Sequence, residues 1–240
     1  MSNNIYYKKM NILSICIPTY EMKGYGHIFL EKSFKILINQ TFKDFDVIIS
    51  DHSRDNLIEN LCIEYKDKLK IHYYKNNNNL GSSSANINNA IKNANGKLIK
   101  ILFQDDFLFN EKSLENIVQN FNLEKYNWLV TACTRSKDGV TFLGSFYPKY
   151  NHLIHLGKNT ISSPSVLTIK NESPLLFDEN LLWLMDVDYY KRCYNKFGNP
   201  KILNEINVVN RTGAHQVSSS IINLPIKIKE LTYMLIKYKI

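Results

Sequence analysis

The stretch that decides the fold runs from residue 81 to residue 106 and reads GSSSANINNAIKNANGKLIKILFQDD. Its serines at 82–84 are typical helix N-caps, and small and apolar residues then recur at helical spacing as far as Ala94. Gly96 is expected to end that helix, and the apolar run 98–103 predicts a buried strand. A helix that leads directly into a buried strand, with two adjacent acids at the strand's end, is typical of an α/β sheet.

The residues before this stretch repeat the alternation of strand and helix. Apolar runs predict buried strands at 12–17, 45–50 and 70–74, and helical spacing predicts helices at 30–38 and 57–65. Because strands that alternate with helices form βαβ units, the sequence predicts the α/β class. We expect a Rossmann-like, mainly parallel central sheet flanked by helices.

The residues after 106 have a less regular pattern. Strands are expected at 126–133, 166–169 and 202–210, and a helix at 181–197. Since no convincing linker or internal repeat separates this part from the first, we expect one compact domain.

We expect that domain to cover residues 1–225, with one half at 10–106 and the other at 107–225. A basic amphipathic C-terminal helix is expected at 226–240, where four lysines accompany one acid, Glu230. This composition is typical of a helix that lies on a membrane surface. The alternative is a closing helix packed on the domain, which we favour because the apolar positions are not confined to one side.

The composition is that of a globular protein, with 44% hydrophobic and 22% charged residues. No apolar run approaches the ~20 residues of a membrane-spanning helix. The first residues lack the apolar core of a signal peptide, so we expect no export. The cysteines are scattered and form no CxxC pair, which favours reduced thiols in a cytoplasmic protein. They are Cys16, Cys62, Cys133 and Cys193.

The formal net charge of +8 indicates an anionic partner. No helix-turn-helix, zinc-finger or RNP signature is present, so nucleic acid is not expected. A nucleoside diphosphate, an anionic acceptor or an acidic membrane surface fits the same charge. The absence of Walker A and GxGxxG motifs argues against ATPases and dehydrogenases.

Polar residues follow the predicted parallel strands at one edge of the sheet. Thr19 follows the first strand, Asp51 the second, and Asp105 and Asp106 the fourth. Open parallel sheets bind ligands at this edge. Since like charges repel unless a cation lies among them, clustered acids here predict a hard divalent cation, Mn²⁺ or Mg²⁺. The pair Asp44–Asp46 precedes its strand and is interpreted as a solvated turn.

Four segments resemble family 2 glycosyltransferases, which are inverting enzymes of the GT-A fold. They are LSICIPTYE at 13–21, QTFKDFDVIISDHSRDN at 40–56, the stretch 81–106, and FDENLLWLMDVDYYKR at 177–192. The resemblance implies a GT-A fold in which 10–106 binds the nucleotide and a smaller part, 107–225, binds the acceptor.

The resemblance also implies an activity, hexosyltransferase-type (EC 2.4). A metal-dependent enzyme of this kind moves a sugar from a UDP- or dTDP-type donor, with inversion, to a hydroxyl of a glycan or lipid-linked acceptor. Surface polysaccharide synthesis in bacteria is the expected setting. The expected location is the cytoplasm, including the inner face of the membrane if the C-terminal tail makes peripheral contact there.

Roles for individual residues follow from the same resemblance. Those expected to bind the donor's base and ribose are Pro18, Thr19, Tyr20, Glu21, Asp51, Ser53 and Asp105. Asp106 matches the direct metal ligand, and His215 is a second candidate ligand, with a surface turn as the alternative. Asp186 matches the general base that takes the proton of the acceptor hydroxyl, with Asp188 as its rival. Trp183 beside it is a candidate acceptor contact.

The sequence departs from the family pattern at two places. Met185 stands where an acid usually precedes the base, and the stretch 82–86 lacks the basic residue that often reaches the diphosphate. The metal, Lys97 or Arg211 could meet that charge instead.

Two other functions remain open. A sugar-phosphate nucleotidyltransferase normally has a glycine-rich, basic loop directly after its first strand, and the residues there, 18–21, lack one. The second is a non-catalytic GT-A protein that binds a nucleotide or a glycan.

Overall fold

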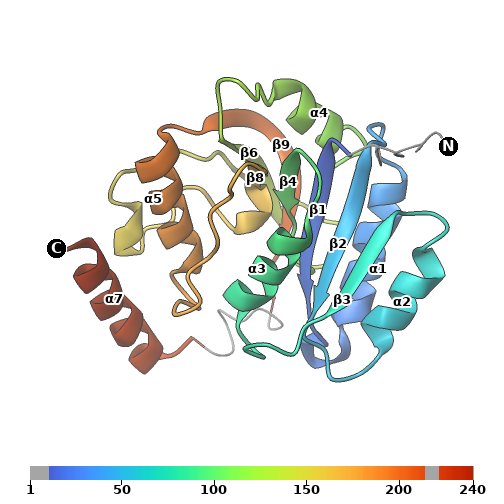
Figure 1. Cartoon of the computed structure of the whole chain (residues 1–240), viewed down its shortest axis with the longest axis horizontal. Helices are drawn as coiled ribbons and strands as arrows, with labels where there is room; N and C mark the ends of the chain where they lie inside the picture. The colour runs from blue at the N-terminus through green and yellow to red at the C-terminus, as the bar shows by residue number, and fades with distance from the viewer. Residues whose placement is uncertain (1–10, 214–221, 240) are drawn as a thin grey trace, which may run out of the picture.

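The computed structural model describes residues 11–213 and 222–239, shown in Figure 1. Its strands are β1 (Leu13–Thr19), β2 (Phe45–Asp51), β3 (Ile71–Lys75), β4 (Leu98–Ile101), β5 (Phe107–Leu108), β6 (Trp128–Ser136), β7 (Ser145–Phe146), β8 (Leu167–Lys170) and β9 (Lys201–Arg211). Its α-helices are α1 (Gly26–Ile38), α2 (Leu57–Tyr65), α3 (Ser83–Asn93), α4 (Ser113–Asn120), α5 (Met185–Phe197) and α7 (Leu224–Tyr238).

The strands form one sheet in the order β3-β2-β1-β4-β8-β6-β9-β5, and β7 pairs with β6. The pairs β2–β3, β1–β2 and β1–β4 are parallel, whereas β8 runs antiparallel to both β4 and β6. The strand β6 therefore runs in the direction of β4, as does β9, which pairs with β6 in parallel. The predicted α/β class and the mainly parallel sheet are confirmed.

Helices cover both faces of the sheet (Figure 1). In β1, Ile15 and Ile17 point into a core shared with α1 and α2, while Cys16 points into a second core shared with α3 and α5. Because both faces are covered, the whole strand is buried, which explains its mainly apolar sequence.

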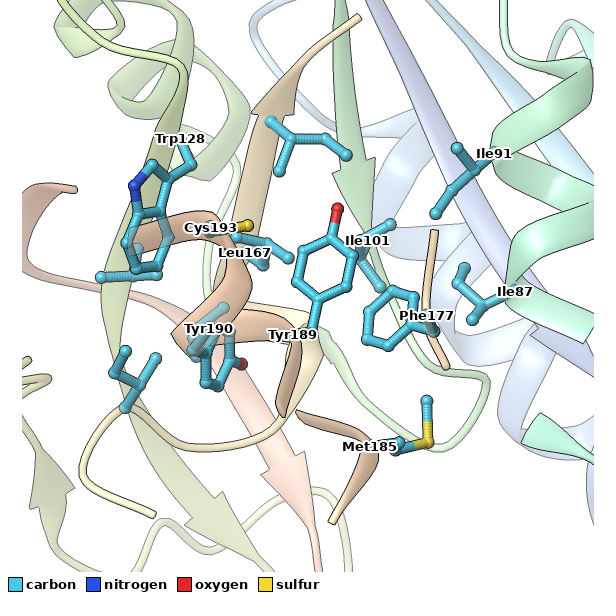
Figure 2. Packing of buried hydrophobic residues seen from close by; sticks show 14 of the residues in the cluster. Ile87, Ile91, Ile101, Trp128, Leu167, Phe177, Met185, Tyr189, Tyr190 and Cys193 are labelled. Carbon is cyan, nitrogen blue, oxygen red and sulfur yellow. The ribbon is translucent and has the colours of Figure 1, made fainter. Parts of the chain in front are cut away.

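Aromatic rings fill much of the second core, as Figure 2 shows. Phe177 stacks on Tyr189 with ring centroids 4.0 Å apart, and Trp128 stacks on Tyr190 at 6.3 Å. Tyr189 and Tyr190 are successive residues of α5, so these contacts fix the helix against β6 and against the segment before it.

Three local predictions differ from the structure. The helix predicted at 181–197 begins at Met185, and α4, β5 and β7 were not predicted. Gly96 does not end α3, which stops at Asn93; a side chain on Gly96 would lie 2.5 Å from the N atom of Ser14. The reading of Asp44–Asp46 as a solvated turn is wrong at Asp46. That carboxylate is buried within β2 and accepts a 2.7 Å hydrogen bond from Ser14 Oγ.

The C-terminal helix α7 packs on the second half of the chain, as the closing-helix alternative predicted. Glu230 and Met234 are buried, whereas Leu224, Ile228 and Ile236 face solvent. None of the helices among the described residues is long and apolar enough to span a bilayer.

Candidate functional site

The site lies where the chain reverses its direction of travel across the sheet. From β1 the chain passes through α1 to β2 on one side, and α3 later returns it to β4 on the other side of β1. The carboxyl ends of β1 and β4 therefore flank a topological switch point, where open α/β sheets bind ligands.

A pocket of about 220 Å³ opens at this edge and is lined by both halves of the chain. From the first half come Pro18, Tyr20, Met22, Ser83, Phe103, Gln104, Asp105 and Asp106. From the second half and the segment before α7 come Ser163, Pro164, Leu182, Trp183, Met185, Asp186, Asn210 and Ile222.

Asp106 is held at the base of the pocket by neutral donors. Its Oδ1 accepts the backbone N–H of Arg211 at 2.9 Å, and its Oδ2 accepts Ser163 Oγ at 3.1 Å and Asn210 Nδ2 at 2.8 Å. Only 4% of the residue is exposed. Burial first, and then the charge of Asp105, raise the pKa of this carboxyl. A cation at the carboxylate would favour its ionised form.

The residues here fit a metal that the substrate helps to bind. Among residues 11–213 and 222–239, no group of three His, Cys, Asp or Glu side chains is placed to hold a metal ion. The donors that hold Asp106 are neutral groups, so its negative charge is not paired with a cationic side chain among these hydrogen bonds. Mg²⁺ commonly binds through one or two carboxylates with phosphate oxygens and water. His215, the second predicted ligand, lies outside the described residues.

The predicted donor-binding residues divide into two groups. Pro18, Tyr20 and Asp105 line the pocket. Asp51 lies beneath them, fully buried, and accepts hydrogen bonds from Thr19 Oγ1 at 3.1 Å and from Ser53 Oγ at 2.6 Å. Thr19, Asp51 and Ser53 therefore form one hydrogen-bonded cluster that is not part of the pocket wall.

The other oxygen of Asp51 is also paired. Its Oδ2 accepts Tyr73 OH at 2.8 Å and Lys75 Nζ at 3.2 Å, both from β3. Burial and the bond to Asp51 raise the pKa of Tyr73. A nucleobase that reached Asp51 would have to displace one of these donors.

The turn after β1 sets the shape of the pocket entrance. The carbonyl of Glu21 accepts the N–H groups of Gly24 and Gly26, and Glu21 is absent from the pocket lining. The N–H of Tyr20 donates to Gln104 Oε1 at 2.9 Å, which joins this turn to the loop after β4. The buried Gln104 Nε2 has no hydrogen-bond partner among the described residues.

Asp186 and its rival Asp188 have different surroundings. Asp186 lines the pocket, and its Oδ2 accepts Asn159 Nδ2 at 2.6 Å. Burial raises the pKa of this carboxyl to about 6, against the hydrogen bonds from Val187 N–H and Asn159. Asp188 is fully buried and bonds to Arg192, as well as to α7. Of the two, only Asp186 can meet a ligand in the pocket.

A network of neutral side chains connects Asp186 with Asp106. Asn159 bonds to Asp186 and to the carbonyl of Ser162, and Ser162 Oγ donates to Asn210, which bonds to Asp106. Ser162 has φ of 99°, a left-handed conformation that costs energy in a non-glycine residue. This network was not predicted, because single Asn and Ser residues give no periodic pattern in the sequence.

The two basic residues suggested for the diphosphate do not line the pocket. Lys97 precedes β4 and bonds to residue 11 through its backbone, so it lies at the opposite edge of the sheet and that suggestion is wrong. The guanidinium of Arg211 lies 4.5 Å from the ring centroid of Phe29. Its Nε donates to the carbonyl of Asp105 at 3.3 Å, so it supports the acidic loop from behind.

Comparison with known proteins decides the family. The model of glycosyl transferase family 2 matches residues 14–168, more than half of the chain. The chain belongs to glycosyl transferase family 2. The resemblance stated from the sequence is thereby confirmed, and the matched segment includes most of β1, all of α3 and the Asp105–Asp106 loop.

Curated relatives of this family 2 chain are bacterial. A GalNAc(5)-diNAcBac-PP-undecaprenol beta-1,3-glucosyltransferase of Campylobacter jejuni is 33% identical over 131 residues, which is 53% of this chain and 40% of that protein. An uncharacterized glycosyltransferase of Rickettsia prowazekii is 25% identical over 242 residues, 93% of this chain and 70% of that protein. The chain thus spans less than half of the Campylobacter enzyme.

Solved structures confirm the GT-A fold. TarS 1-349 of S. aureus, in complex with UDP-GlcNAc, matches with a TM-score of 0.73 at 17% identity, covering 94% of this chain and 66% of that one. The mannosyltransferase PcManGT of Pyrobaculum calidifontis, in complex with GDP-Man and Mn²⁺, matches with a TM-score of 0.60 at 13% identity, covering 85% and 57%.

Proposed function

We propose that this family 2 chain is a metal-dependent, inverting glycosyltransferase. It moves a sugar from a UDP- or dTDP-type donor to a hydroxyl of a glycan or lipid-linked acceptor in the synthesis of a bacterial surface polysaccharide. The observation that carries the proposal is that Asp106, from the nucleotide-side loop, and Asp186, from α5, line the same pocket. A transferase needs both a place for the leaving diphosphate and a base for the acceptor.

The donor is assigned to the half at 10–106. Tyr20 and Pro18 form the wall for the nucleoside, and the unpaired Gln104 Nε2 is a donor close to that wall. Asp106 would hold Mn²⁺ or Mg²⁺, with His215 as a second ligand. When bound, the cation offsets the charge that develops on the departing diphosphate. The TarS complex with UDP-GlcNAc supports a uridine donor by analogy of fold.

The acceptor is assigned to the half at 107–225, where Asp186 acts as general base. As the acceptor oxygen forms its bond to the anomeric carbon, Asp186 accepts the hydroxyl proton. The bond from that carbon to the diphosphate oxygen breaks, and its electron pair leaves with the diphosphate. Attack on the face opposite the leaving group inverts the anomeric carbon, and Trp183 offers an apolar surface to the acceptor.

A thermal-shift series tests the donor and metal assignments together. UDP, dTDP and GDP are each added with Mn²⁺ or with EDTA to wild type, Asp106→Asn and the control Asp67→Asn, which changes an exposed acid after α2. We expect one nucleotide to raise the melting temperature only with Mn²⁺, and this rise to vanish in Asp106→Asn alone. A wild type that responds to no nucleotide would contradict the proposal.

A non-catalytic nucleotide- or glycan-binding protein is the competing function, and turnover separates the two. Incubation of the stabilising nucleotide-sugar with Mn²⁺ should release the nucleoside diphosphate by slow hydrolysis in wild type. Release equal to that from buffer alone would favour a binding protein.

We also propose that α7 brings the protein to the inner face of an anionic membrane. Its outer side exposes Leu224, Ile228 and Ile236, the last with 73% of its surface accessible, and Lys227 and Lys229 lie beside them. Apolar side chains flanked by lysines suit anionic lipid head groups. The Campylobacter relative is named for its action on a GalNAc(5)-diNAcBac-PP-undecaprenol substrate, which is consistent with such a location.

Vesicle sedimentation tests this contact. Wild type should sediment with vesicles that contain phosphatidylglycerol and much less with pure phosphatidylcholine. Ile228→Glu should abolish sedimentation, while the control Ile63→Glu, on the exposed side of α2, should not. Equal sedimentation of both variants would rule out α7 as the contact.

A further inference from the structure

Carboxylates join α7 to the segment that forms one wall of the pocket. Asp178, before α5, bonds to Tyr233 OH at 2.8 Å and to Lys237 Nζ at 2.6 Å. Asp188, inside α5, bonds to the same Lys237 at 2.6 Å and to Tyr238 OH at 2.9 Å. The helix therefore holds both ends of the segment 178–188.

Between these two anchors, Glu230 holds the backbone of the wall directly. Its Oε1 accepts the N–H groups of Leu182 at 2.8 Å and Trp183 at 3.2 Å. Its Oε2 accepts those of Trp183 at 3.0 Å and Leu184 at 2.8 Å. Three successive backbone N–H groups thus converge on one carboxylate, which is 3% exposed.

The position of this carboxylate meets a need of α5. The helix begins at Met185 after the N-cap residue Leu184, whose side chain makes no capping hydrogen bond. Helix N-termini leave N–H groups unpaired and favour negative charge. Glu230 supplies that charge from a different helix. It pairs the three backbone N–H groups just before the helix, and the helix predicted from residue 181 begins at Met185.

The held segment carries the residues that face the pocket. Trp183 and Met185 line it, and Asp186 is only two residues beyond the last N–H group that Glu230 binds. We propose that Glu230 is a positioning residue: through the backbone of 182–184 it sets the acceptor wall and the direction of Asp186. This inference rests on the proposed function in that Asp186 is taken as the general base.

The charge of Glu230 acts on Asp186 as well. Burial is the main cause of the raised pKa of Asp186, and the negative charge of Glu230 raises it further. Tyr190, on the same helix as Asp186, is a second titratable neighbour, and its own pKa is raised by burial and then by Asp186. Removal of the Glu230 charge should therefore lower the pKa of Asp186.

Steady-state transfer assays on three variants test the proposal. Glu230→Gln keeps the shape of the side chain but places an amide NH₂ against backbone N–H groups. Glu230→Asp keeps the charge on a shorter side chain. The control Glu64→Gln makes the same Glu-to-Gln change on the exposed side of α2. We expect kcat to fall about 100-fold in Glu230→Gln, as misplacement of about 1 Å causes, and less in Glu230→Asp. The acceptor KM should rise in both, while Mn²⁺-dependent nucleotide binding and Glu64→Gln stay at the wild-type level.

A titration of Asp186 by carboxyl ¹³C NMR, assigned with Asp186→Asn, gives a readout that needs no turnover. The midpoint should move to lower pH in Glu230→Gln. Unchanged kcat, acceptor KM and midpoint would overturn the proposal, as would a loss of nucleotide binding equal to the loss of transfer, which indicates general destabilisation. If the wild type transfers no sugar but the midpoint still moves, the proposed function fails and the link from Glu230 to Asp186 stands.

Discussion

Asp186 and Asp188 lie on the same turn of α5, but substitution of Asp186 should reduce activity whereas substitution of Asp188 should reduce stability. Asp186→Asn should keep its fold and lose about 100-fold to 10,000-fold of its transfer rate, because an amide cannot accept the hydroxyl proton. Asp188→Asn should lose about 3–5 kcal/mol of stability, because it removes the buried partner of Arg192 and one of the two carboxylates that bind Lys237. Urea denaturation and transfer assays on both variants check this contrast. A stable but inactive Asp188→Asn would assign the base to Asp188 instead.

The pH dependence of transfer follows from the burial of Asp186. A base must be ionised, and burial raises the pKa of this carboxyl to about 6, so kcat/KM should rise with pH through about 6. An aspartate in water would place that rise about two units lower. The free energy of unfolding changes in the opposite direction. Because the pKa of Asp186 is higher in the folded than in the unfolded protein, ionisation of Asp186 lowers stability as the pH rises from the unfolded pKa to the folded pKa. Activity profiles between pH 4.5 and 8 at saturating Mn²⁺ measure the midpoint, and a flat profile down to pH 5 would exclude this base.

The start of α1 touches the pocket loops so closely that only glycine fits. A side chain on Gly26 would lie 2.1 Å from the carbonyl oxygen of Tyr20 and 2.7 Å from Gln104 Nε2. Gly26→Ala should therefore push both pocket residues out of place and weaken nucleotide binding at least tenfold. Isothermal titration with the stabilising nucleotide and Mn²⁺ measures this, and Ile28→Ala, a half-exposed position on the same helix, is the control. Equal affinity in Gly26→Ala and wild type would show that the loop adjusts.

The elements also show which parts of the fold the sequence could predict. The strands β1, β2 and β4 are buried along their whole length, so each is a mainly apolar run that is visible in the sequence, although Ser14, Asp46 and Lys100 interrupt it. The acids at their ends could be placed at one edge because parallel strands end together. The second half was harder to predict because its contacts involve distant partners: the N–H groups that lead into α5 bond to Glu230, 46 to 48 residues away. Single polar residues such as Asn210 give no periodic signal.

The four cysteines are distributed over both halves of the molecule. Cys16 lies in β1, Cys62 in α2, Cys133 in β6 and Cys193 in α5, and all four are buried and unpaired. Burial raises the pKa of each thiol, to about 12 for Cys62 and Cys193, so the reactive thiolate is scarce in the folded protein.

Because a modifying reagent reaches these thiols only after the structure over them opens, each one is an internal reporter of local opening. Pulsed alkylation followed by mass spectrometry should modify all four rapidly in denaturant and slowly in buffer, with rates that differ between the two halves. Rapid native labelling at Cys16 would contradict the buried sheet. The native cysteines can thus show, without any introduced label, whether nucleotide binding reduces local opening in the donor half alone or in the acceptor half as well.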